Sequence, residues 1–362
     1  MRVLILAQHI SRALGGIEIQ CDLIAHELLA LGHEVHYAVV MDKSRELPTA
    51  EYPLHRWTPG NTAQTATLFD SIRADIVYLR HNKIALRATA RAAARAGVPL
   101  VFAASSLQDV EPWSYHRQHV AWSPRRLASV AWQRIKSRWN WSGFHWVSAA
   151  ISLNQDYTDR LPVTRRTHIP DAMDSVAESF EWPRPFVVWV AQIKDYKNPG
   201  DYVELARRCV DLDLDFLMVG QLISKRYRWI ADSSRSPANF HYLGAKTPVQ
   251  VNGVLAAAMA LVHTCDPEGF GNNFIQAWLQ GTPSFSLRFD PGGVITRERL
   301  GSVPGNLVGL ERDLRALVAN KSERAAMGAR ALRYARENHD PAINTRRLAS
   351  FLLGVVKERP QP

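Results

Sequence analysis

Short apolar runs alternate with helical stretches along most of this chain, and this alternation restricts the fold more than any other feature. The run from Arg2 to Ala7 is typical of a buried strand. The stretch at 17–31 that follows places leucine and isoleucine at helical spacing and ends at Gly32. Because parallel strands need a long crossover between them, strands that alternate with helices predict an α/β fold with parallel sheets.

The alternation occurs twice, with a polar, proline-punctuated stretch at about 162–185 between the two series. In the first series, strands are expected at 2–7, 34–40, 75–79, 99–103 and 146–153, with helices at 17–31 and 85–96. In the second series, strands are expected at 186–190, 215–219, 240–243, 260–263 and 284–286, with helices at about 200–210, 248–258, 273–280, 310–318, 321–338 and 341–356. At roughly 100–200 residues per domain, the length predicts two doubly wound domains, at 1–170 and 183–340. A closing helix in 341–362 is expected to pack back on the first domain.

The composition is that of a globular protein. Hydrophobic residues make up 46% of the chain and charged residues 22%. The three cysteines, Cys21, Cys209 and Cys265, lack Cys-x-x-Cys spacing, so neither a disulfide framework nor a structural zinc site is expected. The first apolar run is too short for a signal peptide, and no apolar run of about 18 residues predicts a spanning helix. These features favour the cytoplasm.

A formal net charge of +10 predicts an anionic partner. In the segment 113–146, tryptophans are interleaved with basic residues: Trp113, Arg117, Trp122, Arg125, Arg126, Trp132, Arg134, Lys136, Arg138, Trp139, Trp141 and Trp146. This composition is typical of an interfacial segment and predicts peripheral contact with an anionic membrane. A pair of packed helices with core tryptophans and solvated arginines explains it equally well. A nucleic-acid partner is disfavoured, because these residues form no recognised binding module.

The densest candidate site is the stretch 263–278, in which a strand end, a glycine-rich turn and a helix start follow one another. In an open parallel sheet this position faces the ligand-binding edge. Gly269 and Gly271 would let a ligand approach the backbone, and Asn272 would cap a helix whose N-terminus favours a phosphate. Glu268 would then be free to accept hydrogen bonds from sugar hydroxyls. The alternative is a plain strand-to-helix loop with a capping asparagine.

This stretch resembles the donor-site signature of the retaining glycosyltransferases of family 4, in which a glutamate precedes the helix and a second acidic residue lies within it. Here Glu268 and Gln276 hold the two positions. The resemblance implies that Glu268 contacts the donor sugar and that Gln276 contacts the ribose. It also implies a GT-B fold, with two Rossmann-like domains that face a cleft, as in the glycogen synthase and phosphorylase-like superfamily.

Three further segments carry the resemblance, and one of them, 281–293, is similar to text that closes the donor pocket in the family. In 191–199 the family places an arginine and a lysine on the donor diphosphate; Lys197 matches the lysine, and Gln192 stands at the arginine position. Lys194 and Arg288 are candidates to replace the missing charge. Taken alone, a lysine in such a turn is a solvated surface charge. The Gly15-Gly16 pair is similar to the family's glycine-rich loop near the donor phosphates. The donor-binding residues expected are Gly15, Gly16, Gln192, Lys197, Glu268, Gly269, Phe270, Gly271, Asn272, Asn273, Phe274 and Gln276.

Many members of the family carry a histidine near the reacting sugar, where this chain reads 103–109 without one. Asp109 is the candidate catalytic residue there, with Ser105 and His81 as alternatives. The Asp-x-Asp text at 211–215 is similar to the metal site of glycosyltransferases of the other major fold. It leads into a strand at the edge of the sheet opposite the ligand, so its carboxylates are expected to be solvated. No metal and no other cofactor is expected.

These features predict a hexosyltransferase-type glycosyltransferase that moves a sugar from a nucleotide-sugar donor to a saccharide acceptor, which could be lipid-linked. Glu268, Lys197 and Asp109 are the expected catalytic residues. The resemblance implies retention of anomeric configuration and a role in cell-surface polysaccharide or glycolipid synthesis. The protein is expected in the cytoplasm, including the inner face of the plasma membrane. A sugar-nucleotide epimerase of the same fold and a non-catalytic sugar-nucleotide-binding homologue are the alternatives.

Overall fold

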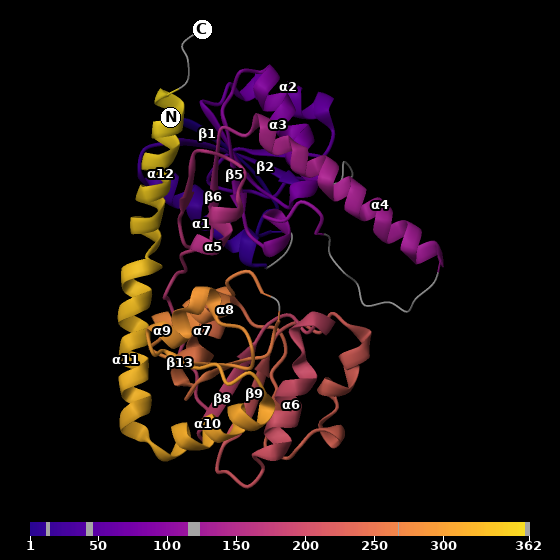
Figure 1. Ribbon diagram of the computed structural model, residues 1–362. Helices are drawn as coiled ribbons and strands as arrows, with labels where there is room; N and C mark the ends of the chain where they lie inside the picture. The colour runs from indigo at the N-terminus through magenta and orange to yellow at the C-terminus, as the bar shows by residue number, and fades with distance from the viewer. Residues whose placement is uncertain (12–14, 41–45, 115–123, 267, 359–362) are drawn as a thin grey trace. The chain divides into compact units, whose positions relative to one another are not determined.

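The computed structural model describes residues 1–11, 15–40, 46–114, 124–266 and 268–358 of the chain (Figure 1). The chain forms two compact units. The first comprises Met1–Asp171 together with the closing segment from Pro341 onward, and the second comprises Ala172–Asp340. Each unit is built around one parallel sheet.

The sheet of the first unit has seven strands in the order β3-β2-β1-β4-β5-β6-β7, all parallel. The strands are β1 Arg2–Ala7, β2 Glu34–Val40, β3 Leu54–Trp57, β4 Ile76–Arg80, β5 Leu100–Ala104, β6 Ala149–Ser152 and β7 Arg166–His168. The helices are α1 Gly16–Ala30, α2 Thr62–Ile72, α3 Leu86–Arg95, α4 Pro124–Trp141, α5 Gln155–Arg160 and α12 Pro341–Lys357.

Both faces of this sheet are covered, which explains why its central strands β1, β4, β5 and β6 are almost wholly apolar. Leu4 and Leu6 of β1 belong to the core on the side of α2 and α3, whereas Val3 and Ile5 belong to the core on the side of α1 and α12. The closing helix therefore packs against α1 and completes the core of the first unit, and Leu352 at its centre is fully buried.

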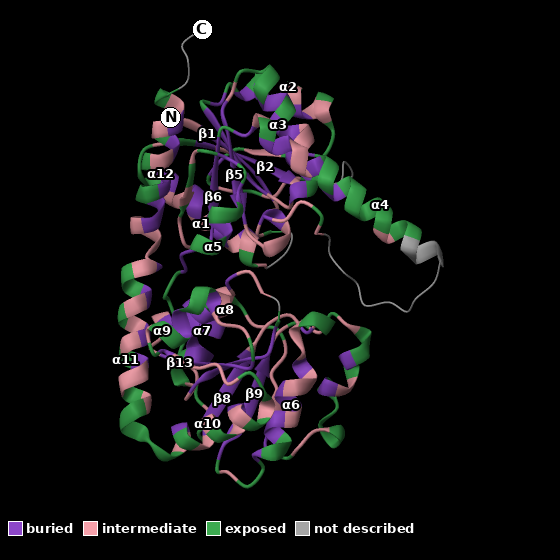
Figure 2. Ribbon diagram, viewed as in Figure 1, coloured by how far each residue is buried: buried purple, intermediate pink, exposed green. Residues whose placement is uncertain are grey.

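The sheet of the second unit has six strands in the order β10-β9-β8-β11-β12-β13, again all parallel. The strands are β8 Phe186–Val190, β9 Asp215–Val219, β10 Phe240–Tyr242, β11 Leu261–His263, β12 Ser284–Ser286 and β13 Gly301–Ser302. The helices are α6 Pro199–Arg208, α7 Pro248–Ala257, α8 Asn272–Leu279, α9 Val294–Arg297, α10 Leu307–Ala319 and α11 Lys321–Asn338. Figure 2 shows the buried strands between these layers of helices.

The predicted alternation of strands and helices is confirmed, with β1, β2, β8, β9 and β12 at the predicted bounds. The prediction was wrong about the stretch at 162–185, which is not a plain linker, because β7 lies within it and pairs with β6. The elements β3 and α2 were also missed. None of the described helices is both long and apolar enough to cross a bilayer.

The basic, tryptophan-rich segment forms α4, a helix that extends beyond the sheet of its own unit (Figure 1). Trp132, Ile135 and Trp139 are exposed, so these residues are not core residues. Trp141 and Trp146 do pack against the core of the unit. The residues 115–123, which include Arg117 and Trp122, lie outside the described part of the chain, as do the side chains of Arg125 and Arg126.

Gly253, inside α7, provides a test of the packing of the second unit. A Cβ atom at this position would lie 1.9 Å from the carbonyl oxygen of Glu178, so the chain passes over the helix at backbone contact. Alanine normally stabilises a helix interior by about 1 kcal/mol relative to glycine. Here we expect Gly253→Ala to lower the free energy of unfolding by about 1–3 kcal/mol, because the overpacked segment must shift.

Denaturant unfolding followed by circular dichroism measures this change. The matched control is Gly200→Ala in α6, where a Cβ would meet only Tyr227 at 3.9 Å. An unchanged or raised stability of Gly253→Ala would contradict the packing of the 174–178 segment on α7.

Candidate functional site

Strands β8 and β11 are neighbours at the centre of the second sheet. From β8 the chain continues through β9 and β10 toward one edge, and from β11 it continues through β12 and β13 toward the other. The loops that follow β8 and β11 therefore meet at a topological switch point, where open α/β sheets bind ligands. Lys197 lies in the first loop, in the short 3-10 turn Asp195–Lys197, and Glu268 lies in the second.

Three hydrogen bonds fasten the two loops together. The indole of Trp189 donates to the Thr264 hydroxyl (2.9 Å), and that hydroxyl donates to the carbonyl of Lys197 (2.7 Å). The side-chain amide of Asn198 donates a hydrogen bond to the backbone carbonyl of Thr264 (3.1 Å). Asn198 adopts the left-handed conformation (φ 48°), which asparagine tolerates better than most residues. This frame fixes the backbone that carries Lys197.

The Lys197 ammonium donates to Oε2 of Glu268 in a largely buried ion pair. Burial opposes the charge of Lys197, but Glu268 raises its pKa above the usual range. Burial likewise opposes ionisation of Glu268, but His263 and Lys197 hold its pKa well below the usual range. Both groups are therefore charged at neutral pH. Lys197 is not the solvated surface lysine that such a turn favours on its own.

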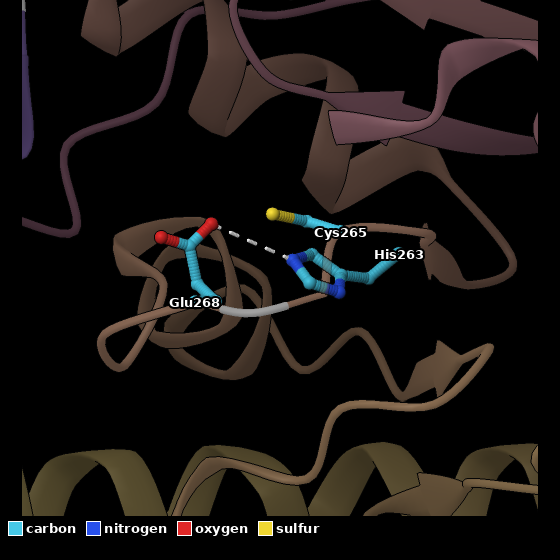
Figure 3. A group of neighbouring side chains, drawn as sticks. All are labelled: His263, Cys265 and Glu268. Carbon is cyan, nitrogen blue, oxygen red and sulfur yellow. Dashed lines mark ion pairs between the residues drawn. The ribbon is translucent and has the colours of Figure 1, made fainter. Parts of the chain in front are cut away.

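Two further side chains adjoin this ion pair, namely His263 at the end of β11 and Cys265 beyond it (Figure 3). His263 Nε2 lies 3.9 Å from Glu268 Oε2, and burial lowers the pKa of the imidazole. Burial raises the pKa of the Cys265 thiol to about 12. Sequence reasoning gave neither side chain a role. The sequence signal that could have identified them is a histidine, a cysteine and a glutamate close together at the end of a buried strand.

The glycine-rich turn leads into α8 differently from the prediction. Asn272 is the first residue of the helix rather than its cap, and the N-cap is Gly271, whose φ of 87° favours glycine. A Cβ atom at Gly271 would lie 2.9 Å from the Phe274 ring. Asn273 donates to the carbonyl of Val190 (2.9 Å) and so ties α8 to the end of β8.

The aromatic residues of this turn are core residues. Phe270 is buried against Trp278 and His339, with ring centroids 6.2 and 5.3 Å away. Phe274 is fully buried and packs beside His263, with ring centroids 4.5 Å apart and ring planes tilted by 43°. Gly269 lies next to the carboxylate, and its N–H donates to Glu268 Oε1 (3.3 Å). Phe270 and Phe274 therefore pack in the core that supports the loop, and neither presents a ring face to solvent.

The two glutamines at expected donor positions differ in environment. Gln276 is buried, and its amide donates to the Asn252 side chain (3.1 Å). Gln192 is half-buried in the loop after β8. Arg288, one of the residues considered as a replacement cation, is 46% exposed and lies 3.7 Å from the carboxylate of Asp201.

The remaining candidates belong to the first unit. Gly15 is the N-cap of α1, and Gly16 is the first residue of that helix. The buried Asp109 accepts hydrogen bonds from the N–H groups of Lys83, Ser105 and Ser106 and from the Ser106 hydroxyl, at 3.0–3.2 Å. Burial raises the pKa of Asp109, and these donors oppose that rise. The carboxylate therefore fastens the loop after β5.

The Asp-x-Asp text lies at the amino end of β9, whereas Lys197 and Glu268 follow the carboxyl ends of the parallel strands β8 and β11. Asp211 pairs with Arg315 (2.7 Å), and Asp213 pairs with Arg184 (2.9 Å). The prediction of solvated carboxylates was wrong for Asp215, which is buried and bound by Trp182 and Arg184. All three carboxylates are therefore paired with arginine, and Asp213 and Asp215 share Arg184.

No protein-family model matches the sequence, and no curated protein matches it. Solved structures do match the fold. HepE of Anabaena, in complex with UDP and glucose, superposes with a TM-score of 0.73 at 16% identity, over 98% of this chain and 100% of that one. Sucrose-phosphate synthase of Thermosynechococcus elongatus gives 0.77 at 13% identity (98% and 99%), and WaaG, a glycosyltransferase involved in lipopolysaccharide biosynthesis, gives 0.71 at 17% (98% and 100%). The two parallel-sheet units and these likenesses show that the chain has the GT-B fold.

Proposed function

We propose that this protein is a glycosyltransferase that moves a sugar from a nucleotide-sugar donor to a saccharide acceptor. The observation that supports this proposal most is the buried Lys197–Glu268 ion pair at the switch point of the second sheet. A nucleotide-sugar donor carries a diphosphate, which needs a cation, and a sugar, whose hydroxyls need an acceptor. The pair supplies one of each.

Without a donor, Lys197 and Glu268 neutralise each other. A diphosphate that binds at this site offers Lys197 a stronger, doubly charged partner, and charge-assisted hydrogen bonds to phosphate are among the strongest available. As Lys197 turns to the diphosphate, Glu268 becomes free to accept hydrogen bonds from the donor sugar. Ligand binding thus exchanges one ion pair for another, and the burial already present strengthens the new contacts.

The start of α8 is the second proposed anchor for the diphosphate. Gly269 and Gly271 keep the preceding turn open to a ligand, and the N-terminus of a helix attracts anions through its dipole and its N–H groups. In this proposal Asn272 and Asn273 lie at the phosphates, Gln192 lies beside them and Gln276 lies toward the nucleoside. Gly15 and Gly16 are proposed to leave space for the phosphates, and Asp109 to position the loop that meets the acceptor.

We propose retention of configuration and catalysis without a metal cofactor, because a fixed ammonium and a helix dipole can stabilise the departing diphosphate. A UDP-sugar is the first donor to test, since the structure of HepE holds UDP and glucose. We propose that the acceptor is a saccharide used in the synthesis of a cell-surface polysaccharide or glycolipid. A role at the inner face of the plasma membrane fits the exposed face of α4.

That exposed face carries both features of a membrane-binding surface. Trp132, Ile135 and Trp139 are 66%, 58% and 61% exposed and lie on one side of the helix. Lys136 and Arg138 flank this side of the helix and are also exposed. The opposite side of α4 is held to its own unit by buried residues, including Ser137, whose hydroxyl donates to the carbonyls of Pro112 and Ser114.

The transfer proposal predicts that Lys197→Ala and Glu268→Gln each lower kcat/KM with a UDP-sugar donor by about 100-fold or more, the usual cost of removing one buried group that stabilises the transition state. Product analysis with and without a saccharide acceptor measures transfer. It also separates a transferase from an epimerase, which forms its product without an acceptor, and from a homologue that only binds the donor.

Lys321→Ala is the matched control, because Lys321 is an exposed lysine of the same unit. Transfer at wild-type rates by both Lys197→Ala and Glu268→Gln would refute the assignment of the site.

The membrane proposal predicts that the full-length protein floats with vesicles that contain anionic lipid and is released by salt. Basic residues near such a surface contribute about 1 kcal/mol each, and salt screens them. The double variant Trp132→Ser/Ile135→Ser should lose flotation, whereas Val308→Ser, at an equally exposed site of the second unit (66%), should retain it. Flotation that is equal for all three proteins would count against α4 as the binding surface.

A further inference from the structure

Three potential metal ligands converge beside the proposed donor site. His263, Cys265 and Glu268 each offer one ligand atom, and these atoms all lie within 4.8 Å of one another (Figure 3). His263 is the last residue of β11, and Cys265 and Glu268 lie in the loop that follows it. The strand and its loop therefore position the three residues together. Imidazole, thiolate and carboxylate form the mixed N, S and O set that zinc accepts in proteins.

The imidazole of His263 is arranged as a ligand would be. The side chain is 3% exposed, and its Nε2 has no hydrogen-bond partner among the residues that the structure describes. The other ring nitrogen, Nδ1, lies 3.4 Å from the Ser286 hydroxyl. A metal-binding histidine characteristically has its second nitrogen engaged in this way.

The thiol of Cys265 is available to a metal only by losing its proton. A zinc ion that binds there converts the thiol to a zinc thiolate and releases the proton to solvent. Cys265 is buried together with His263, so such a site would be closed to most competing ligands.

Lys197 would compete with a metal ion for the carboxylate of Glu268. Its ammonium contacts the same Glu268 Oε2 that faces His263 Nε2. An ammonium and a divalent cation cannot share that oxygen, because they repel each other across a short, poorly screened distance. Glu268 can therefore serve Lys197 or a metal ion, but not both at once.

We propose that His263, Cys265 and Glu268 bind one zinc ion in place of the Lys197–Glu268 ion pair, as an inhibitory site and not as a cofactor site. The ligand atoms now lie within 4.8 Å of one another, and zinc bonds of about 2.0–2.3 Å require the three side chains to turn closer together around the ion. The inhibitory consequence rests on the proposed function, since the ion would occupy the carboxylate assigned to the donor sugar. The binding of zinc itself does not rest on it.

The test uses full-length, chelator-treated protein and metal alone, with no nucleotide present. Titration with zinc chloride should show one bound ion, and cobalt should give a thiolate-to-cobalt charge-transfer band in the near ultraviolet. Cys265→Ser should abolish that band and weaken zinc binding by about tenfold or more. Cys209→Ser, at a buried cysteine outside the cluster, should change neither.

Lys197→Ala gives the most selective result. Removal of the competing ammonium should tighten zinc binding, whereas the same change should weaken binding of the nucleotide-sugar donor. Absence of the cobalt band in the wild-type protein, or zinc binding that is unchanged in Cys265→Ser, would overturn the zinc site. A donor that binds equally well to Lys197→Ala would instead overturn the proposed function, so the two failures are distinguishable.

Discussion

The ion pair between Lys197 and Glu268 is the interaction on which the functional account depends. Two opposite charges taken out of water cost several kcal/mol each unless they are paired, and even a paired set rarely stabilises a fold more than apolar residues would. In the proposed function, the site keeps these two charges because each can exchange its partner for a group of the bound donor. A lysine and a glutamate that satisfy each other in the free protein are poised to bind an anion and a polyhydroxylated group.

Placement of this pair follows from sheet topology and from a few local bonds. The strand order reverses between the central strands β8 and β11. The loops that follow these two strands are far apart in sequence but meet at the carboxyl ends of the strands. The side chains of Thr264 and Asn198 fasten those loops by hydrogen bonds to backbone carbonyls, and Gly271 turns the chain into α8 with a φ that other residues avoid. His263 and Cys265 lie inside the same frame, next to Glu268.

Much of the fold could be predicted from the sequence, because buried parallel strands are apolar on both faces and therefore stand out as short apolar runs. The short edge strands β3 and β7 were missed, since edge strands carry polar residues such as Arg56 and Arg166 that resemble loops. Side-chain partners were harder still. Asn272 resembled a cap until the backbone placed Gly271 there, and Asp215 resembled a solvated carboxylate until Trp182 and Arg184 were seen to bury it.

The most direct measurement is a crystal structure of the full-length protein with its nucleotide-sugar donor bound. The account predicts that Lys197 Nζ leaves Glu268 and lies within hydrogen-bonding distance of a diphosphate oxygen, with Glu268 on a hydroxyl of the sugar. A donor diphosphate bound elsewhere, with Lys197 still paired to Glu268, would contradict it.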